Sequence, residues 1–348
     1  MADYGFGIVG LGMIAEFHAR AIDAMTGGRL VAAFSRNQSK ADSFCAEHGG
    51  KAYSDIDAFL ADPDLQIVTV CTPSGLHLDP ACKAAAAGKH VVVEKPLEIT
   101  PERCDGILAA CQQAGVKLAT VFPSRFADAA MLVKSSIDGG RFGKLTLGSA
   151  YIKWWRTQDY YDSGAWRGTW DLDGGGALMN QSIHAIDLLQ WFMGPVESIV
   201  ARTDCLAHER IEVEDVAAAI LKFENGAIGV IEGSTAAYPG QLKRLEVCGT
   251  EGSMILEQDS LKQWEFAEET AEDAAIRDRF AAGESSGGQS DPKAISFVGH
   301  QKQFEDFVKA LDGGKPLVDG AEGRKSVEII NAIYRSARAG GAPVKLPL

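Results

Sequence analysis

The 348-residue chain lacks the features that mark membrane and nucleic-acid-binding proteins. It has no apolar run near the roughly 18 residues that cross a bilayer. It also has no stripe rich in lysine and arginine of the kind that neutralises a phosphate backbone. The net charge of -13 comes from acidic residues scattered along the sequence. These absences predict that neither a membrane nor a nucleic acid is a partner.

Cysteine is present but poorly patterned for metal or disulfide chemistry. The seven cysteines are odd in number and include no C-x-x-C pair, which predicts small buried thiols and no metal site. The first residues run directly into an apolar segment, with no charged leader or cleavage site. We therefore expect a cytoplasmic protein.

Length and composition indicate a soluble protein of two domains. The chain is 46% hydrophobic and 23% charged, as in ordinary globular proteins, and it exceeds the size at which one core usually stops growing. Over residues 1–122, apolar runs at 5–9, 30–34, 65–70, 90–93 and 116–121 alternate with helical stretches at 13–25, 40–48, 56–60, 79–87 and 101–114. Strands that are apolar throughout belong in a parallel sheet covered on both faces. This pattern predicts a Rossmann dinucleotide-binding domain of the α/β class.

Residues 123–348 predict an α+β domain with a large, mostly antiparallel open sheet. Strand patterns occur at 145–154, 199–204, 216–223, 227–234, 242–248 and 253–256, and helical patterns at 128–137, 300–311 and 320–339. Glu224-Asn225-Gly226 is the clearest hairpin signal. Residues 268–292 are acidic and rich in glycine and serine, and we expect a mobile excursion there.

A glycine motif near the N-terminus predicts dinucleotide binding. Gly10 and Gly12 follow a predicted strand, and Met13, Ile14 and Ala15 open a helix. Gly10 permits a tight turn, Gly12 lets the backbone approach a pyrophosphate, and the helix N-terminus faces the anion. A purely structural glycine turn is the alternative.

The end of the second strand bears on the choice between NAD and NADP. An acidic residue there usually binds the ribose 2′-hydroxyl of NAD, whereas arginine beside a hydroxyl residue suits the 2′-phosphate of NADP. Ser35-Arg36 occupies this place. The sequence therefore favours NADP slightly, with NAD as the alternative cofactor. Arg36 could also be a solvated loop residue that contacts no cofactor.

Two further segments carry candidate catalytic groups. Three valines lead into Glu94-Lys95-Pro96, which puts a cation at the carboxyl end of a buried strand, where ligands bind in open α/β sheets. Later, three glycines at 174–176 precede Asn180 and His184, which lie four residues apart and share a helix face with Asp187. We expect the glycines to let a substrate or the nicotinamide approach closely. Taken alone, a histidine such as His184 is more often a buried core imidazole than a catalytic group.

In this order and spacing, the three motifs resemble the glucose-fructose oxidoreductase/inositol 2-dehydrogenase (Gfo/Idh/MocA) family of nicotinamide-dependent sugar and polyol oxidoreductases. The resemblance implies that Lys95 lies beside the reacting hydroxyl and that His184 takes its proton. Many members have Asp where this chain has Asn180. Because an amide cannot exchange a proton at neutral pH, His184 is the predicted base, with Asn180 beside it. In having Asn at this position, the chain resembles the nucleotide-sugar 3-dehydrogenases of the family.

Motifs and resemblance together predict the remaining site residues. Arg125, and Trp166-Arg167 in an aromatic-rich segment with Tyr160, resemble family positions near cofactor or substrate. The predicted cofactor contacts are Gly10, Gly12, Met13, Ile14, Ser35, Arg36, Cys71, Thr72, Pro73, His77, Glu94, Lys95, Pro96, Arg125, Trp166 and Arg167. The predicted substrate contacts are Lys95, Arg125, Tyr160, Asn180 and His184, with His300 and Tyr334 as possible cleft residues.

The predicted function is hydride transfer between nicotinamide C4 and a ring secondary alcohol or ketone of a sugar, sugar derivative or inositol. Two alternatives share the fold: an NAD-dependent glycosidase, and a cofactor-sensing regulator without catalysis. The intact Lys95 and His184 argue against the regulator. We expect a homodimer or homotetramer formed through the C-terminal sheet.

Overall fold

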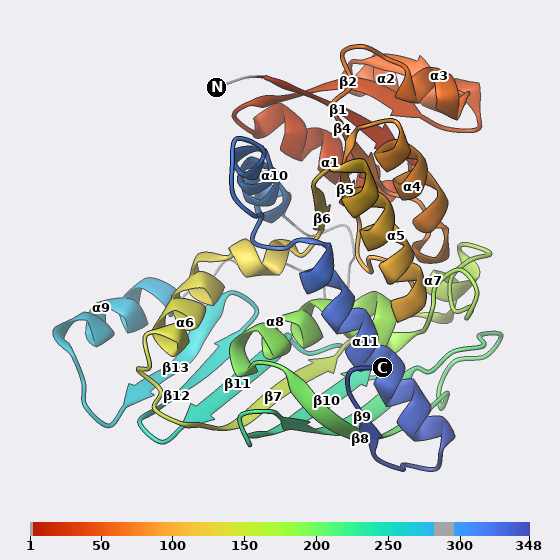
Figure 1. The fold of residues 1–348 in the computed structure, drawn as a ribbon. Coiled ribbons are helices and arrows are strands. Elements are labelled where there is room, and N and C mark those ends of the chain that lie inside the picture. Colours follow the sequence, from red (N-terminus) through yellow and green to blue (C-terminus); the bar gives the residue numbers. More distant parts are fainter. Residues whose placement is uncertain (1–2, 282–295) are drawn as a thin grey trace. The chain divides into compact units, whose positions relative to one another are not determined.

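The computed structural model describes residues 3–281 and 296–348, and the chain forms two compact units (Figure 1). Unit 1 contains Met1–Pro123 and Phe297–Arg324, and unit 2 contains Ser124–Ser296 and Lys325–Leu348. The first crossing between the units, at 123/124, falls one residue after the expected boundary at 122/123. The expected second domain, however, also included 297–324, a segment that belongs to unit 1.

Unit 1 is built on a six-stranded parallel sheet in the order β3-β2-β1-β4-β5-β6, which confirms the predicted Rossmann fold. The strands are β1 Tyr4–Val9, β2 Gly28–Phe34, β3 Lys51–Tyr53, β4 Ile67–Val70, β5 His90–Val93 and β6 Leu118–Thr120. The connecting helices are α1 Met13–Ala24, α2 Gln38–His48, α3 Ile56–Leu60, α4 Leu78–Ala86 and α5 Pro101–Ala114. The sequence did not predict β3, because three residues at the edge of a sheet are too few to show an apolar run.

Helix α10 (Val298–Leu311) explains why the chain returns to unit 1. Phe304 and Phe307 are fully buried in the same core as Phe6 of β1, and α10 packs against α1. The Gln303 side chain accepts from the Phe122 N–H and donates to a carbonyl of β6. Sequence patterns predicted α10 itself but not its partner, because the contacting residues lie about 300 positions apart.

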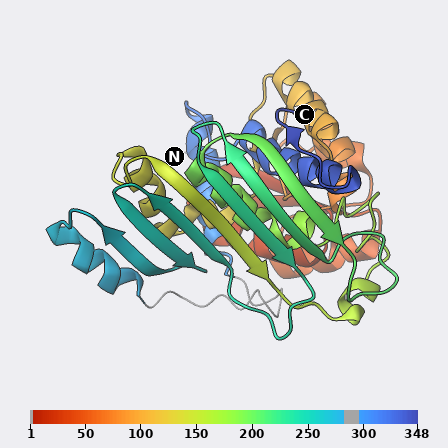
Figure 2. The same ribbon diagram turned by 90° about the horizontal axis from the view of Figure 1, so that it is seen from below.

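Unit 2 contains an eight-stranded sheet in the order β13-β12-β11-β7-β10-β9-β8-β14. Its strands are β7 Leu145–Lys153, β8 Val196–Asp204, β9 Val216–Phe223, β10 Ile228–Ser234, β11 Arg244–Gly249, β12 Gly252–Glu257, β13 Ser260–Phe266 and β14 Val344–Lys345. All neighbours pair antiparallel except β7 and β10, which confirms a mostly antiparallel sheet. Helix α8 (Ile183–Met193) packs on β7 and β11, and Figure 2 shows the opposite face, on which no described helix lies.

Other helices of unit 2 are α6 (Asp128–Asp138), which packs against α8, and the short α7 (Gln158–Asp162). Helix α11 (Gly320–Arg338) crosses from unit 1 into unit 2. None of the described helices is long and apolar enough to cross a membrane.

The expectation of an irregular excursion over 268–292 is corrected in its first part. Residues Ala271–Phe280 form α9, and residues 282–292 lie outside the described part. A capping box between Thr270 and Asp273 starts the helix, and Asp273 also accepts from Arg141 and from the Trp264 indole N–H at 2.8 Å. The helix is held by these polar contacts, so its sequence shows little of the apolar periodicity on which helix prediction depends.

Candidate active site

The glycine loop has the geometry that a dinucleotide requires. Gly10 has φ +89°, and a Cβ there would lie 2.8 Å from the backbone nitrogen of Thr72, so only glycine fits beside the end of β4. A Cβ at Gly12 would meet nothing within 4 Å, which leaves open space beside the loop. Helix α1 begins at Met13, followed by Ile14, with no side-chain cap on its first turn. The Ala15 N–H donates to the Gly12 carbonyl oxygen at 3.1 Å, and the uncapped first turn leaves the N–H groups of Met13 and Ile14 to an anion.

The strand ends around this loop carry the other predicted cofactor residues. Exposed Arg36 follows β2, and the Ser35 hydroxyl accepts from the Asn37 N–H. Thr72 and Pro73, after β4, are partly exposed, as is Lys95 after β5. The Lys95–Pro96 peptide is cis. These positions lie at the carboxyl ends of parallel strands, where ligands bind in such sheets.

Several predicted cofactor side chains point into the protein. His77 is 1% exposed, and its ring nitrogens lie 2.9 Å from the carbonyl oxygens of Pro96 and Thr72. Cys71 and Glu94 are also buried and bonded to protein groups. The side chains of Cys71, His77 and Glu94 are thus occupied inside unit 1, and their predicted role at the cofactor stays a prediction. The His77 ring ties the residues after β4 to those after β5.

Glu94 is the most heavily bonded of these groups. Its Oε1 lies 2.8 Å from Nε2 of His18 and 3.6 Å from Nε2 of His300, and its Oε2 accepts from the Lys95 N–H at 3.0 Å. Burial alone would raise the pKa of Glu94, but the two histidines hold it well below its usual range. His300 was a possible cleft residue, and the structure instead buries it beside Glu94.

Arg125 also differs from its predicted role. It lies in a turn before α6 and is fully buried. Its Nε and Nη2 donate to the two carboxylate oxygens of Asp187 at 2.8 and 2.7 Å, and its guanidinium lies over the Trp191 ring. A fully buried bidentate pair offers no surface to cofactor or substrate, so we assign Arg125 to the structure of unit 2. Asp187, which the sequence placed on one helix face with Asn180 and His184, is the other half of this pair.

Asn180 lies in a π-helical turn, Ala177–Ser182, that runs directly into α8. Such turns are rare and often mark functional sites. Asn180 Nδ2 donates to Asp173 Oδ1 at 2.6 Å, and Asn180 Oδ1 accepts from the Gln181 amide at 3.1 Å. His184, partly exposed, is the second residue of α8. The sequence predicted one α-helical face for Asn180 and His184. The structure corrects this, because Asn180 lies in the wider π-helical turn and His184 in the α-helix that follows it.

A cationic and aromatic cluster lies beside Asn180 within unit 2. The Tyr160 hydroxyl accepts from Arg167 at 2.6 Å and from the Gln181 amide at 2.9 Å, and buried Arg156 donates to Gln181 Oε1 at 2.8 Å. Both guanidinium groups lie over the Tyr160 ring, and Arg167 also lies over the ring of Trp166. Burial raises the pKa of Tyr160. The structure thus brings together Tyr160, Trp166, Arg167 and Asn180, all predicted from sequence.

A carboxyl group that the sequence did not single out holds the start of the π-helical turn. Glu214 accepts from the backbone N–H of Gly176 at 3.0 Å and of Leu178 at 2.8 Å, and from the Tyr334 hydroxyl at 3.0 Å. Burial outweighs these hydrogen bonds and raises the pKa of Glu214 to about 7. Tyr334, a possible cleft residue in the sequence, is buried and bonded to Glu214.

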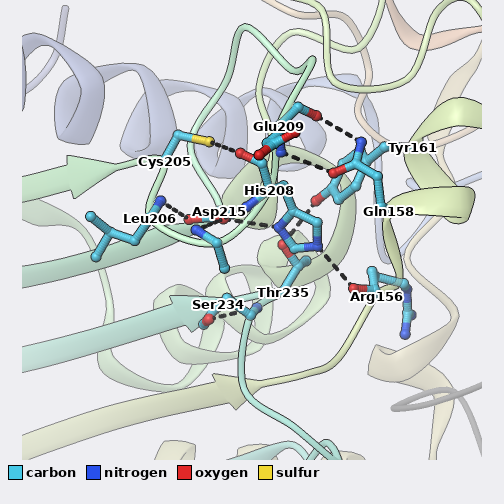
Figure 3. A network of polar contacts seen from close by, with 12 residues as sticks. Arg156, Gln158, Tyr161, Cys205, Leu206, His208, Glu209, Asp215, Ser234 and Thr235 are labelled. Atoms are coloured by element: carbon cyan, nitrogen blue, oxygen red, sulfur yellow. Dashed lines mark hydrogen bonds and ion pairs between the residues drawn. The ribbon is translucent and has the colours of Figure 1, made fainter.

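A second network, shown in Figure 3, also has no local sequence signal. Asp215 accepts from the backbone N–H groups of Leu206 and His208, and lies 2.9 Å from the His208 ring. The other ring nitrogen of His208 lies 2.9 Å from the carbonyl oxygen of Arg156. The network therefore ties the loop before β9, which carries Glu214, to the segment that carries Arg156. These residues are about 50 positions apart, so local patterns could not predict the contact.

Comparison with known proteins identifies both units. Residues 4–122 match the oxidoreductase family with the NAD-binding Rossmann fold, and residues 131–255 match the GFO/IDH/MocA C-terminal domain. The WlbA dehydrogenase from Bordetella pertussis, solved with NADH and UDP-GlcNAcA, superposes with a TM-score of 0.91 at 36% identity, covering 100% of this chain and 99% of that one. Levoglucosan dehydrogenase from Pseudarthrobacter phenanthrenivorans is 26% identical over 97% of both chains. Inositol 2-dehydrogenase from Rhizobium meliloti is 26% identical over 95% of this chain and 96% of its own.

Proposed function

Because the chain belongs to the GFO/IDH/MocA oxidoreductase family, we propose that it is an NAD(H)-dependent dehydrogenase of a sugar derivative. The reaction is oxidation of a ring secondary alcohol, or reduction of the corresponding ketone. The observation that carries this proposal is the glycine loop of unit 1, where a Cβ at Gly12 would enter open space beside an uncapped helix. Bound nicotinamide would supply the carbon that accepts the hydride.

Lys95 and His184 are the proposed catalytic residues. Lys95 follows a buried strand at the ligand-binding edge of its sheet. We assign it to stabilising the negative charge that develops on the substrate oxygen. We assign His184 to taking the hydroxyl proton with its imidazole ring. Asn180 is the neutral neighbour that positions the substrate.

We propose a nucleotide-linked sugar acid as the substrate class, with UDP-GlcNAcA as the first compound to test. The support is twofold. The WlbA dehydrogenase was solved with this ligand, and the partly exposed guanidinium group of Arg167 lies over the Tyr160 ring beside Asn180. Arginine binds carboxylate and phosphate groups well. Myo-inositol and levoglucosan are the neutral comparison substrates.

The test is NADH formation from NAD with each of these three compounds. Lys95→Ala and His184→Ala should each lower kcat at least about a hundredfold, while NADH still binds. His48→Ala, a histidine outside the proposed site, is the control. Normal turnover in either variant contradicts the catalytic assignment. Glycoside cleavage without net NADH would instead identify a glycosidase, and cofactor binding without turnover a regulator.

For the cofactor, we propose NAD(H) in turnover, because similar dehydrogenases, WlbA and levoglucosan dehydrogenase, were solved with NADH. The sequence favoured NADP on the basis of Arg36. Exposed Arg36 is then the residue that sets how strongly NADP(H) binds.

We also propose that unit 2 forms a homo-oligomer through the uncovered face of its sheet (Figure 2). Ile220 of β9 is 58% exposed and lies in register between Val200 of β8 and Val230 of β10; Ile228 is 53% exposed and pairs with Leu147 of β7. Four adjacent strands thus carry a continuous apolar stripe, which in soluble proteins marks an interaction surface.

Ile220→Asp should reduce the molar mass measured by light scattering after gel filtration. Leu206→Asp, which changes an exposed apolar residue in a loop of unit 2, is the matched control. A wild-type protein that is already monomeric at working concentration would contradict the proposal.

A further inference from the structure

Three buried side chains in unit 1 form a continuous path that ends at the peptide nitrogen of Lys95. His18 comes from the inner face of α1, Cys71 follows β4, and Glu94 follows β5. Cys71 Sγ lies 3.3 Å from Nδ1 of His18, and Nε2 of His18 lies 2.8 Å from Glu94 Oε1. Glu94 Oε2 accepts from the Lys95 N–H at 3.0 Å. The path therefore connects helix α1 and the ends of strands β4 and β5 to Lys95, which carries the proposed catalytic ammonium group.

The chemistry of the donors and acceptors gives this path one proton order. Burial raises the pKa of the Cys71 thiol well above its usual value, so the thiol keeps its proton. The S–H then donates to Nδ1 of His18, which leaves the ring proton on Nε2 to donate to Glu94. Glu94 is ionised and accepts from both sides. The neutral Nε2–H tautomer of His18 satisfies every contact on the path.

None of these side chains is accessible to a ligand. His18 is 0% exposed, Glu94 5% and His300 4%. His300 adds a second imidazole 3.6 Å from Glu94, beyond hydrogen-bond distance, and its ring centroid lies 5.5 Å from that of His18. A buried carboxylate is costly unless its partners are all in place. The cluster must therefore serve something other than direct contact with cofactor or substrate.

We propose that His18 and Glu94 are positioning residues that fix the Lys95 peptide, and hence the direction of the Lys95 side chain, from inside unit 1. This inference rests on the proposed catalytic role of Lys95. The carboxylate bridges two elements, because one oxygen holds α1 through His18 while the other holds the backbone just after β5. Loss of either contact leaves the other buried group without its partner and frees the Lys95 peptide to rotate.

Three variants test the path. Glu94→Gln keeps the shape but has one oxygen for two donors, so its amide N–H group faces either His18 or the Lys95 N–H. His18→Leu removes the ring donor. His18→Gln restores a donor close to the place of Nε2. We expect Glu94→Gln and His18→Leu to lower kcat by about 10- to 100-fold, the scale of a small misplacement of a catalytic group, with the KM for substrate and the Kd for NADH within about threefold. His18→Gln should recover most of the lost kcat.

The matched control for His18→Leu is His48→Leu, which removes another histidine–glutamate contact in unit 1, to Glu16 at 2.5 Å. It should leave kcat unchanged. The double variant Glu94→Gln with His18→Leu should be no slower than the slower single variant, because residues that act as one unit are non-additive. Additive losses, a normal kcat in Glu94→Gln, or losses confined to NADH affinity would overturn the proposal.

Two measurements do not depend on turnover. Nitrogen-15 NMR of the His18 ring should show the neutral Nε2–H tautomer in the wild type, and an imidazolium or the opposite tautomer would overturn the proposal. Metal analysis matters because His18, Glu94 and His300 lie close enough to share an ion. An equimolar divalent metal that His300→Ala removes would also overturn it. If Lys95→Ala retains turnover, the proposed function fails instead, whatever the His18 spectrum shows.

Discussion

Replacing Glu214 with Gln should remove a pH dependence of stability that a single buried carboxyl group creates. The native state raises the pKa of Glu214 from 4.5 to about 7, so it holds this proton more tightly than the unfolded chain does. The proton stabilises the native state fully below pH 4.5, and that stabilisation is lost as the pH rises through about 7. At about 1.4 kcal/mol per pH unit, the loss is on the order of 3 kcal/mol.

The assay is urea unfolding, followed by tryptophan fluorescence, of the wild type and Glu214→Gln between pH 4.5 and about 8. Contributions from all other groups cancel in the difference between the two proteins. Relative to the variant, the wild type should lose about 3 kcal/mol across this range. Glu212→Gln, which changes an exposed carboxylate two residues earlier, is the control and should run parallel to the wild type. Parallel curves for Glu214→Gln would refute the reasoning.

Two further predictions follow from contacts at the two predicted ligand-binding regions. Asn180→Asp would place a second carboxylate where the amide now donates to Asp173 at 2.6 Å. We expect the variant to lose about 1–3 kcal/mol of stability at pH 8, and adding Asp173→Asn should recover it. A thermal melt that the single variant leaves unchanged would contradict this prediction. Replacing Ser35 with Asp and Arg36 with Ile should weaken NADPH at least about tenfold and leave NADH within about threefold, measured by fluorescence titration; equal effects on both cofactors would contradict the role of Arg36.

Local patterns predicted the elements that repeat along the chain, and failed where a contact joins distant residues. Strands β5 and β9 begin and end where the sequence placed them. A strand that is buried on one or both faces shows this burial as an alternating or continuous run of apolar residues. The path to Lys95 left a fainter signal. His18 falls three residues after Ala15 and four before Ile22, on the buried face of α1. A polar ring on an apolar helix face needs a buried partner, but no local pattern points to Glu94.

The glycines before the π-helical turn show how a correct motif can have a different physical cause. The sequence suggested that Gly175 and Gly176 let a ligand approach the helix. In the structure a Cβ at Gly175 would lie 2.1 Å from the Tyr334 hydroxyl, and one at Gly176 would lie 1.9 Å from the Glu214 carbonyl oxygen. The glycines are therefore required because the clamp formed by Glu214 and Tyr334 lies directly against the backbone that leads to Asn180. That clamp and the path beneath Lys95 are built alike: in each, a buried carboxylate accepts from backbone N–H groups beside a proposed catalytic segment. In both units a buried carboxyl group therefore fixes the backbone from inside, next to a residue that we propose for the active site.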